Sequence, residues 1–283
     1  AAGRGGMRVK KLLVVLACAL FLLGLPGCAL SPDIENLISP PRLSETQEEI
    51  LEAVREAAGA GELTLRYPIE GEYRSSVIFR DLDGDGADEA LVFYEDITSA
   101  LSTRIALLSE QQGRWMVLYD LSGMGSQVEQ VDFARMVEGE ADYMMIGWST
   151  PGKTERTLSV YQMRQNRLEE IYTDGYLEFA VWDYSLDGWD DLIYLTFNSR
   201  QNTAVYYSGY RGKVGKVNEV TLSALSTGEY VSLTPGLLES GLGGLAADAM
   251  LDNGGCITEM LAVQENRLTC LTRDEEDAMA TRR

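Results

Sequence analysis

This chain of 283 residues repeats an acidic turn between two apolar, β-favouring runs, and the repeat limits the folds that it can adopt. The turn occurs within residues 77–94 and returns within residues 179–197. A copy that lacks the acidic series lies midway, with Asp132 placed 51 residues after Asp81 and 51 residues before Asp183. The period is therefore close to 50 residues, long enough for several short strands in each unit.

Two further landmarks extend the period along the chain. A weaker fourth copy runs over residues 247–263 and contains Asp248. Polar turns between alternating segments recur at spacings of 53, 49 and 51 residues, at Gly113, Asn166, Gly215 and Asn266. Units of this length are typical of a β-propeller or related array, in which each unit stacks on the next to bury its faces. We expect an all-β, propeller-like repeat domain over residues 65–273, with about four blades visible and a ring that can be incomplete.

The first acidic turn has the spacing of a metal-binding loop. Its acids occupy alternate positions, a glycine allows a sharp turn, and a last acid follows at the ninth position: Asp81, Asp83, Asp85, Gly86 and Glu89. Oxygen ligands that converge in this way suit calcium. An EF-hand needs a glutamate at position twelve and a helix after the loop, whereas this chain has Val92 and a strand-like run. We predict a calcium loop between two strands, completed by the carbonyl of Ala87.

The second acidic turn has one carboxylate fewer. Its expected ligands are Asp183, Ser185, Asp187 and Asp191, with the carbonyl of Trp189. Ser185 stands where the first loop has Asp83, so we expect weaker calcium binding. Acidic turns that bind no metal are the alternative interpretation of both loops.

The two acidic turns resemble the FG-GAP or VCBS-type repeats. The residues that carry the resemblance are Asp-Leu-Asp-Gly-Asp-Gly-Ala-Asp-Glu-Ala-Leu from Asp81 and Asp-Tyr-Ser-Leu-Asp-Gly-Trp-Asp-Asp-Leu from Asp183. The resemblance is closer to the bacterial lipoproteins that carry such repeats, and it covers roughly residues 65–273. It implies that each unit is a four-stranded propeller blade with calcium in the loop between its first two strands. Counted in chain order, the second and fourth copies, which contain Asp132 and Asp248, depart from the metal pattern.

The amino-terminal region has the pattern of a bacterial secretory signal. A short basic segment from Met7 and a 13-residue apolar run precede Leu-Pro-Gly-Cys, which resembles a lipobox ending at Cys28. We predict a signal peptide over 1–27 and lipidation of Cys28, and Met7 is a credible start that would place residues 1–6 upstream of the true chain. The chain would then be held on the extracytoplasmic face of a bacterial cell membrane. An ordinary signal peptide with an incidental Cys28 is the alternative.

Between the anchor and the repeats we expect a tether and one helix. Prolines disfavour helix in the tether, residues 28–43. A capping-box pattern at Ser44 and the apolar positions Ile50, Val54 and Ala57 predict a helix over 44–59. Residues 274–283 are expected to form a tail.

Charge and residue types narrow the function. The formal net charge is −20, and removal of four basic residues with the signal leaves about −24, which argues against a nucleic-acid partner. The chain has no histidine, so His-based triads are excluded and most zinc sites are disfavoured. Neither a phosphate-binding glycine loop nor a Gly-x-Ser-x-Gly elbow occurs. We therefore predict no enzymatic activity.

Two functional classes remain. The first is a lipid-anchored, calcium-binding repeat protein that acts as a binding or scaffold module for an unknown protein or glycan. The second is a secreted glycan-active hydrolase or lyase on a propeller scaffold. Trp189 is the tryptophan placed to be exposed, although packing is the simpler role for it. Cys256 and Cys270 are expected to be packed thiols, with a disulfide as the alternative.

Overall fold

The structure is a computed structural model that describes residues 43–59, 62–96, 103–153, 156–164, 167–198, 201–209, 212–222, 229–251 and 254–271. The expected signal peptide, Cys28, the tether up to residue 42 and the tail at 274–283 lie outside the described residues. Within the described part of the chain, no helix is both long and apolar enough to span a membrane.

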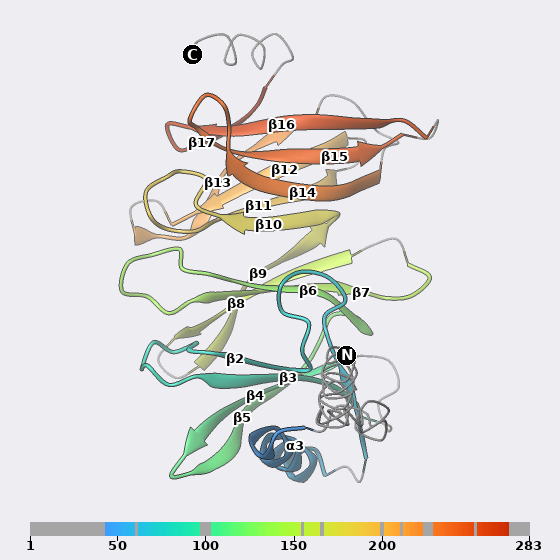
Figure 1. Cartoon of the computed structure of the whole chain (residues 1–283), viewed down its shortest axis with the longest axis vertical. Helices are drawn as coiled ribbons and strands as arrows, with labels where there is room; N and C mark the ends of the chain where they lie inside the picture. Colours follow the sequence, from blue (N-terminus) through green and yellow to red (C-terminus); the bar gives the residue numbers. More distant parts are fainter. Residues whose placement is uncertain are drawn as a thin grey trace, which may run out of the picture. The chain divides into compact units, whose positions relative to one another are not determined.

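The described chain is all-β with one helix, as the period predicted (Figure 1). Four antiparallel sheets follow one another along the sequence, and in the second, third and fourth sheets every strand pairs with its sequence neighbours. The first sheet contains β1 (Leu63–Arg66), β2 (Val77–Arg80), β3 (Glu89–Asp96), β4 (Arg104–Gln111) and β5 (Arg114–Ser122). The second contains β6 (Gln127–Ala134), β7 (Tyr143–Ser149), β8 (Arg156–Arg164) and β9 (Arg167–Tyr176). The third contains β10 (Glu178–Trp182), β11 (Asp191–Asn198), β12 (Gln201–Ser208) and β13 (Gly215–Thr221). The fourth contains β14 (Glu229–Leu237), β15 (Gly243–Met250), β16 (Cys256–Gln264) and β17 (Arg267–Cys270).

The first sheet differs from the others because two short strands share one edge. β1 pairs with residues 93–96 of β3, and β2 pairs with residues 89–92 of the same strand. The segment between β1 and β2 reaches the second sheet, where Ile69 N donates to Val128 O at 3.2 Å and Glu70 N to Glu129 O at 2.8 Å. This segment therefore ties the first two sheets together through backbone hydrogen bonds.

Successive sheets pack through three hydrophobic clusters. One joins the first and second sheets around Phe93 and Trp148, and one joins the second and third around Tyr143 and Tyr194. A third joins the third and fourth sheets around Leu245. The sheets are drawn in chain order in Figure 1, and no core cluster of the described residues joins the first sheet to the fourth.

The helix α3 (Glu45–Ala58) covers the other face of the first sheet. The expected helix is confirmed, but its buried stripe differs from the prediction. Ile50, Leu51 and Val54 are buried, whereas Ala57 is exposed and Ala58 packs against the cluster. Ala58 follows Val54 by four residues, which keeps it on the same face of a helix with 3.6 residues per turn.

The sequence period placed two landmarks in the wrong part of the unit. Asp132 lies inside β6 opposite Met145, and Asp248 lies inside β15 opposite Thr258, so neither belongs to a loop between first and second strands. The loops at that place are residues 135–142 and 238–242. Two of the four polar turns were placed correctly, because Gly113 and Asn266 lie in tight turns with positive φ. Gly215 is instead the first residue of β13, and Asn166 lies outside the described residues.

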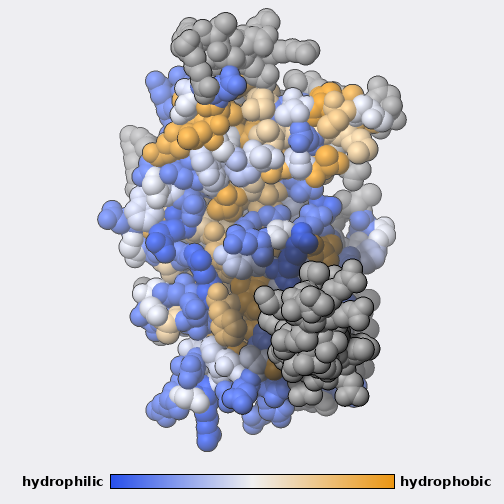
Figure 2. All heavy atoms as spheres, viewed as in Figure 1, coloured by the Kyte–Doolittle hydropathy of each residue, from blue (hydrophilic) through white to orange (hydrophobic). Residues whose placement is uncertain are grey.

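The fourth sheet carries several exposed apolar side chains. Val231 and Leu237 of β14 and Met250 of β15 are all exposed. In Figure 2 the fourth sheet lies in the upper part of the view, and hydrophobic surface gathers there, whereas hydrophilic surface is more frequent over the first two sheets.

Candidate metal centre

The first acidic loop, residues 81–88, connects β2 to β3. Leu82 anchors it, because its buried side chain belongs to the cluster between the first two sheets. Gly84 and Gly86 have φ of 81° and 90°, a conformation that glycine adopts with least strain. The loop also caps itself, since Asp81 accepts hydrogen bonds from Gly84 N at 2.7 Å and from Gly86 N at 3.0 Å.

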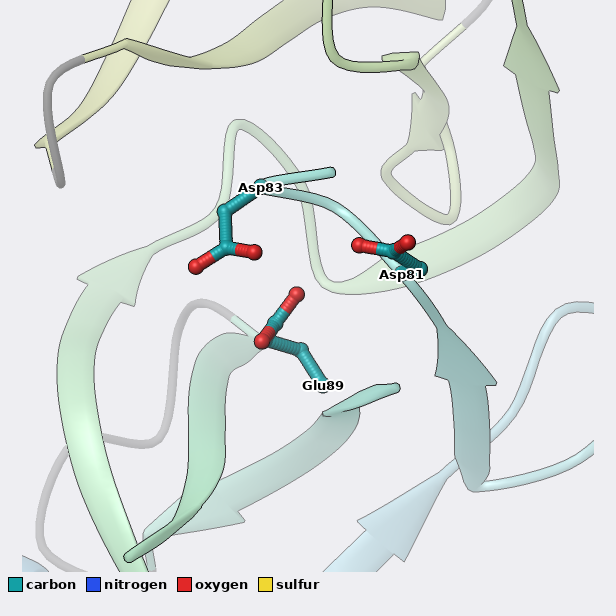
Figure 3. A group of neighbouring side chains, drawn as sticks. All are labelled: Asp81, Asp83 and Glu89. Carbon is teal, nitrogen blue, oxygen red and sulfur yellow. The ribbon is translucent and has the colours of Figure 1, made fainter. Parts of the chain in front are cut away.

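Three carboxylates of this loop converge on one point. Ligand oxygens of Asp81, Asp83 and Glu89 all lie within 4.8 Å of one another. Figure 3 shows the Glu89 carboxylate directed between those of Asp81 and Asp83. Asp85 is not in this group; its Oδ1 accepts a hydrogen bond from Ala87 N at 2.7 Å. The structure thus brings together three of the four acids that the spacing predicted, and the role of the Ala87 carbonyl stays a prediction.

Glu89 is the buried member of the group. Its side chain is buried at the start of β3, and Oε2 accepts a hydrogen bond from Leu82 N at 2.8 Å. Burial raises the pKa of Glu89 to about 7, and the charges of Asp83, Asp85 and Asp81 add to this effect, while the Leu82 hydrogen bond opposes it. A buried carboxylate beside other carboxylates needs a positive charge to be stable when ionised. The donor set, three carboxylates and no nitrogen or sulfur ligand, fits a hard cation such as calcium.

The second acidic loop, residues 183–190, connects β10 to β11 and has a different set of contacts. Asp183 accepts hydrogen bonds from Asp187 N at 3.0 Å and Gly188 N at 2.9 Å, and Asp187 accepts one from Trp189 N at 3.0 Å. Asp191 is buried and accepts a hydrogen bond from Ser185 N at 2.9 Å. The only convergent acidic group among the described residues is the one in the first loop, so the acids expected at the second site are not brought together here.

Asp191 corresponds to Glu89, but hydroxyl groups surround it. Burial raises the pKa of Asp191 to about 6, and hydrogen bonds from Ser208, Ser185 and Tyr206 lower it. Charges of other acids are not among the main causes of this shift, in contrast to Glu89. Protein donors therefore lie near this buried carboxylate, while the buried Ser185 Oγ has no hydrogen-bond partner among the described residues.

The loop between β6 and β7, residues 135–142, makes a contact between sheets that the sequence motifs did not predict. Asp142, its last residue, is buried and forms ion pairs with Arg80 at the end of β2 and with Arg135. Asp190, the last residue of the second acidic loop, accepts a hydrogen bond from Arg135 N at 2.9 Å. In both cases the final aspartate of a loop binds an arginine of the preceding sheet: Asp142 pairs with Arg80 at the end of β2, and Asp190 accepts from Arg135 just after β6. The recurrence of Asp88, Asp142 and Asp190 at spacings of 54 and 48 residues was the signal available in the sequence.

The remaining predicted positions divide between core and surface. Trp115 and Trp182 pack against core clusters, whereas Trp189 lines a cleft beside the first acidic loop. Cys256 and Cys270 are thiols that form no disulfide, as expected, but Cys256 is exposed rather than packed.

Comparison with known proteins adds no assignment. No family model matches the chain, and no curated protein matches it. Among solved structures, the rhamnogalacturonan lyase PL11 of Bacillus licheniformis is similar at 12% identity and a TM-score of 0.32 over 70% of this chain. This chain spans about half of that protein, 53% of its length. A likeness at this level carries no argument about function.

Proposed function

We propose that this protein is a lipid-anchored extracytoplasmic repeat protein whose first acidic loop binds calcium, and that it acts as a binding or scaffold module. The observation that carries the proposal is the convergence of Asp81, Asp83 and Glu89. Glu89 is buried among acids with its pKa raised to about 7, so a cation at this point would remove an unfavourable charge arrangement.

In this proposal the four sheets are propeller blades, and calcium stiffens the connection between the first two strands of a blade. The four antiparallel sheets in chain order, each packed on the next, support that architecture. Asp81, Asp83 and Glu89 would hold the ion, with Asp85 and the carbonyl of Ala87 completing the ligand set. Calcium would supply positive charge that cross-links β2 and β3 through the loop. Asp183, Ser185, Asp187 and Asp191, with the Trp189 carbonyl, would form a weaker second site.

The lipid anchor rests on the amino-terminal sequence. Two or three acyl chains give stable membrane attachment, whereas one chain binds only marginally. Metabolic labelling with an alkyne fatty acid should mark the parent protein and not the Cys28→Ser variant. Equal labelling of both would refute the anchor without affecting the metal site.

Calcium binding is tested directly on the folded protein. Extracellular calcium modules bind with Kd of about 10⁻⁴ to 10⁻³ M, and binding only to the folded state raises its stability. Calorimetric titration should give a binding heat, and 5 mM calcium should raise the melting temperature, while 5 mM magnesium should do so less. Absence of both a heat and a shift would eliminate the calcium site.

The binding role is tested by looking for turnover. A screen of the purified protein on glycan, peptidoglycan and ester substrates should show no product. Product formation that disappears on changing one carboxylate outside both acidic loops would favour the hydrolase or lyase instead.

A further inference from the structure

A cleft of about 500 Å³ lies beside the first acidic loop and is lined by residues from three successive loops. The first loop contributes Asp81 and Asp88, the 135–142 loop contributes Glu140 and Asp142, and the second acidic loop contributes Trp189. Arg80 and Arg135 also line it. The cleft is polar, contains both signs of charge and has one aromatic side chain in its wall.

The polar groups of the cleft are held in place before any ligand arrives. Arg80 Nε donates to Asp142 Oδ2 at 2.9 Å, and the Arg80 guanidinium lies 5.4 Å from the centre of the Phe133 ring. Glu140 Oε2 accepts hydrogen bonds from Tyr143 OH at 2.9 Å and from Gln162 Nε2 at 3.1 Å. Ordered side chains lose little conformational entropy on binding, so such a site gains affinity from its rigidity.

The walls are also fixed relative to one another. The Arg80–Asp142 pair joins the first two loops. Asp190 N donates to Arg135 O at 2.9 Å, and Arg135 N donates back to the Asp190 carboxylate. These two hydrogen bonds join the 135–142 loop to the second acidic loop next to Trp189. Close backbone packing supports this joint, because a Cβ on Gly209 would collide with the carbonyl oxygen of Met136.

From these features we propose that the cleft binds one neutral sugar unit of a glycan. Sugar hydroxyls both donate and accept hydrogen bonds, so they match a wall that presents guanidinium donors and carboxylate acceptors together. The C–H face of a sugar ring is apolar and can pack on the half-buried Trp189 indole. In the calcium-free protein, four carboxylates outnumber two guanidinium groups in the cleft wall, which disfavours an anionic sugar such as a uronate. This inference deepens the proposed binding function by assigning a ligand class to one site.

The test uses the full folded chain and neutral oligosaccharides of four to six units, namely glucan, mannan and galactan fragments, with a galacturonan fragment of equal length as the anionic comparison. Calorimetry in calcium-free buffer should detect binding of at least one neutral fragment and weaker or no binding of the galacturonan. Trp189→Ala should weaken that affinity about ten-fold or more, Trp189→Tyr should retain part of it, and Glu140→Gln should also weaken it.

Tyr67→Ala is the matched control, because Tyr67 is an exposed aromatic residue that does not line the cleft. It should leave binding unchanged. Calcium titration of the same variants separates this inference from the proposed function, since Trp189→Ala removes no side-chain ligand of the first loop. Binding of none of the neutral fragments, preference for the galacturonan, or equal affinity of parent and Trp189→Ala would overturn the sugar site. Absence of calcium binding by the parent protein would instead overturn the proposed metal site.

Discussion

The two acidic loops share a nine-residue spacing, but their buried carboxylates have different surroundings. In both cases the acid that completes the spacing follows the loop at the first position of the next strand, Glu89 in β3 and Asp191 in β11. Glu89 is surrounded by other carboxylates, whereas Asp191 receives hydrogen bonds from hydroxyl groups. The spacing therefore reports a shared backbone shape, and the need for a cation depends on what surrounds the last acid.

The largest expected effect comes from replacing Glu89 and, for comparison, Asp191. For a Kd of about 10⁻⁴ M, 5 mM calcium should stabilise the parent by about 2 kcal/mol. We expect Glu89→Gln to abolish this gain and Asp191→Asn to retain most of it. Chemical denaturation at pH 8 with and without calcium measures both.

Without calcium the two substitutions should differ in sign. Glu89→Gln removes an ionised, buried carboxylate from an acidic cluster, so the variant should be at least as stable as the parent. Asp191→Asn weakens hydrogen bonds to a buried acid and should destabilise. A calcium-stabilised Glu89→Gln protein would contradict the assignment of the first loop.

Exchange of the third loop position sharpens the comparison. Asp83 and Ser185 occupy equivalent places, so Asp83→Ser should lower the calcium affinity of the first loop by about ten-fold, as expected for loss of one charged ligand. Ser185→Asp should raise the affinity of the second loop by a similar factor. Calorimetric titration of each single variant gives the two constants. Unchanged affinity in both variants would mean that this position does not contact the ion.

A half-buried acid outside both loops gives a second test of how the surroundings shift the pKa of a carboxyl group. Burial raises the pKa of Glu178 in β10 to about 7, and the charges of Glu70 and Glu129 add to this effect, while the ion pair with Arg156 at 3.0 Å opposes it. The folded state then holds a proton that the unfolded state releases above about pH 4.5, so stability is lost as the pH rises from there through 7. Between pH 5 and 8 the parent should lose about 1–2 kcal/mol more than Glu178→Gln, after allowance for solvent screening.

This pH effect should not depend on calcium, because Glu178 belongs to neither loop. Denaturation of the parent and Glu178→Gln at pH 5 and pH 8, each with and without calcium, measures it. Equal pH slopes in the two proteins would show that Glu178 ionises normally.

The smallest expected effect concerns backbone strain in the second loop. Leu186 has φ of 59° at the place where the first loop has Gly84, whose φ is 81°. Side chains destabilise this left-handed conformation, so Leu186→Gly should stabilise the protein by about 0.5–1 kcal/mol. Gly84→Ala should cost a similar amount, and thermal unfolding measures both. A destabilised Leu186→Gly variant would mean that Leu186 makes contacts worth more than the strain.

Much of the architecture was predictable from local sequence. Alternating apolar residues predicted strands, a capping box and apolar spacing predicted α3, and glycines marked the loops. The period failed where it relied on single acids, because Asp132 and Asp248 lie within strands rather than in loops. One aspartate carries too little information to set a register, whereas a glycine-containing acidic run restricts the backbone over several residues.

The sequence by itself determined where the acidic loops fall, since glycine and aspartate spacing controls local backbone geometry. The tertiary structure decided which acids meet, that Glu89 is buried beside them, and that Asp142 pairs with Arg80, 62 residues away. Burial and distant charges set the pKa of a carboxylate, and both arise only when sheets pack against one another. The cleft beside Trp189 depends on tertiary structure for the same reason, because three separate loops must come together to form its walls.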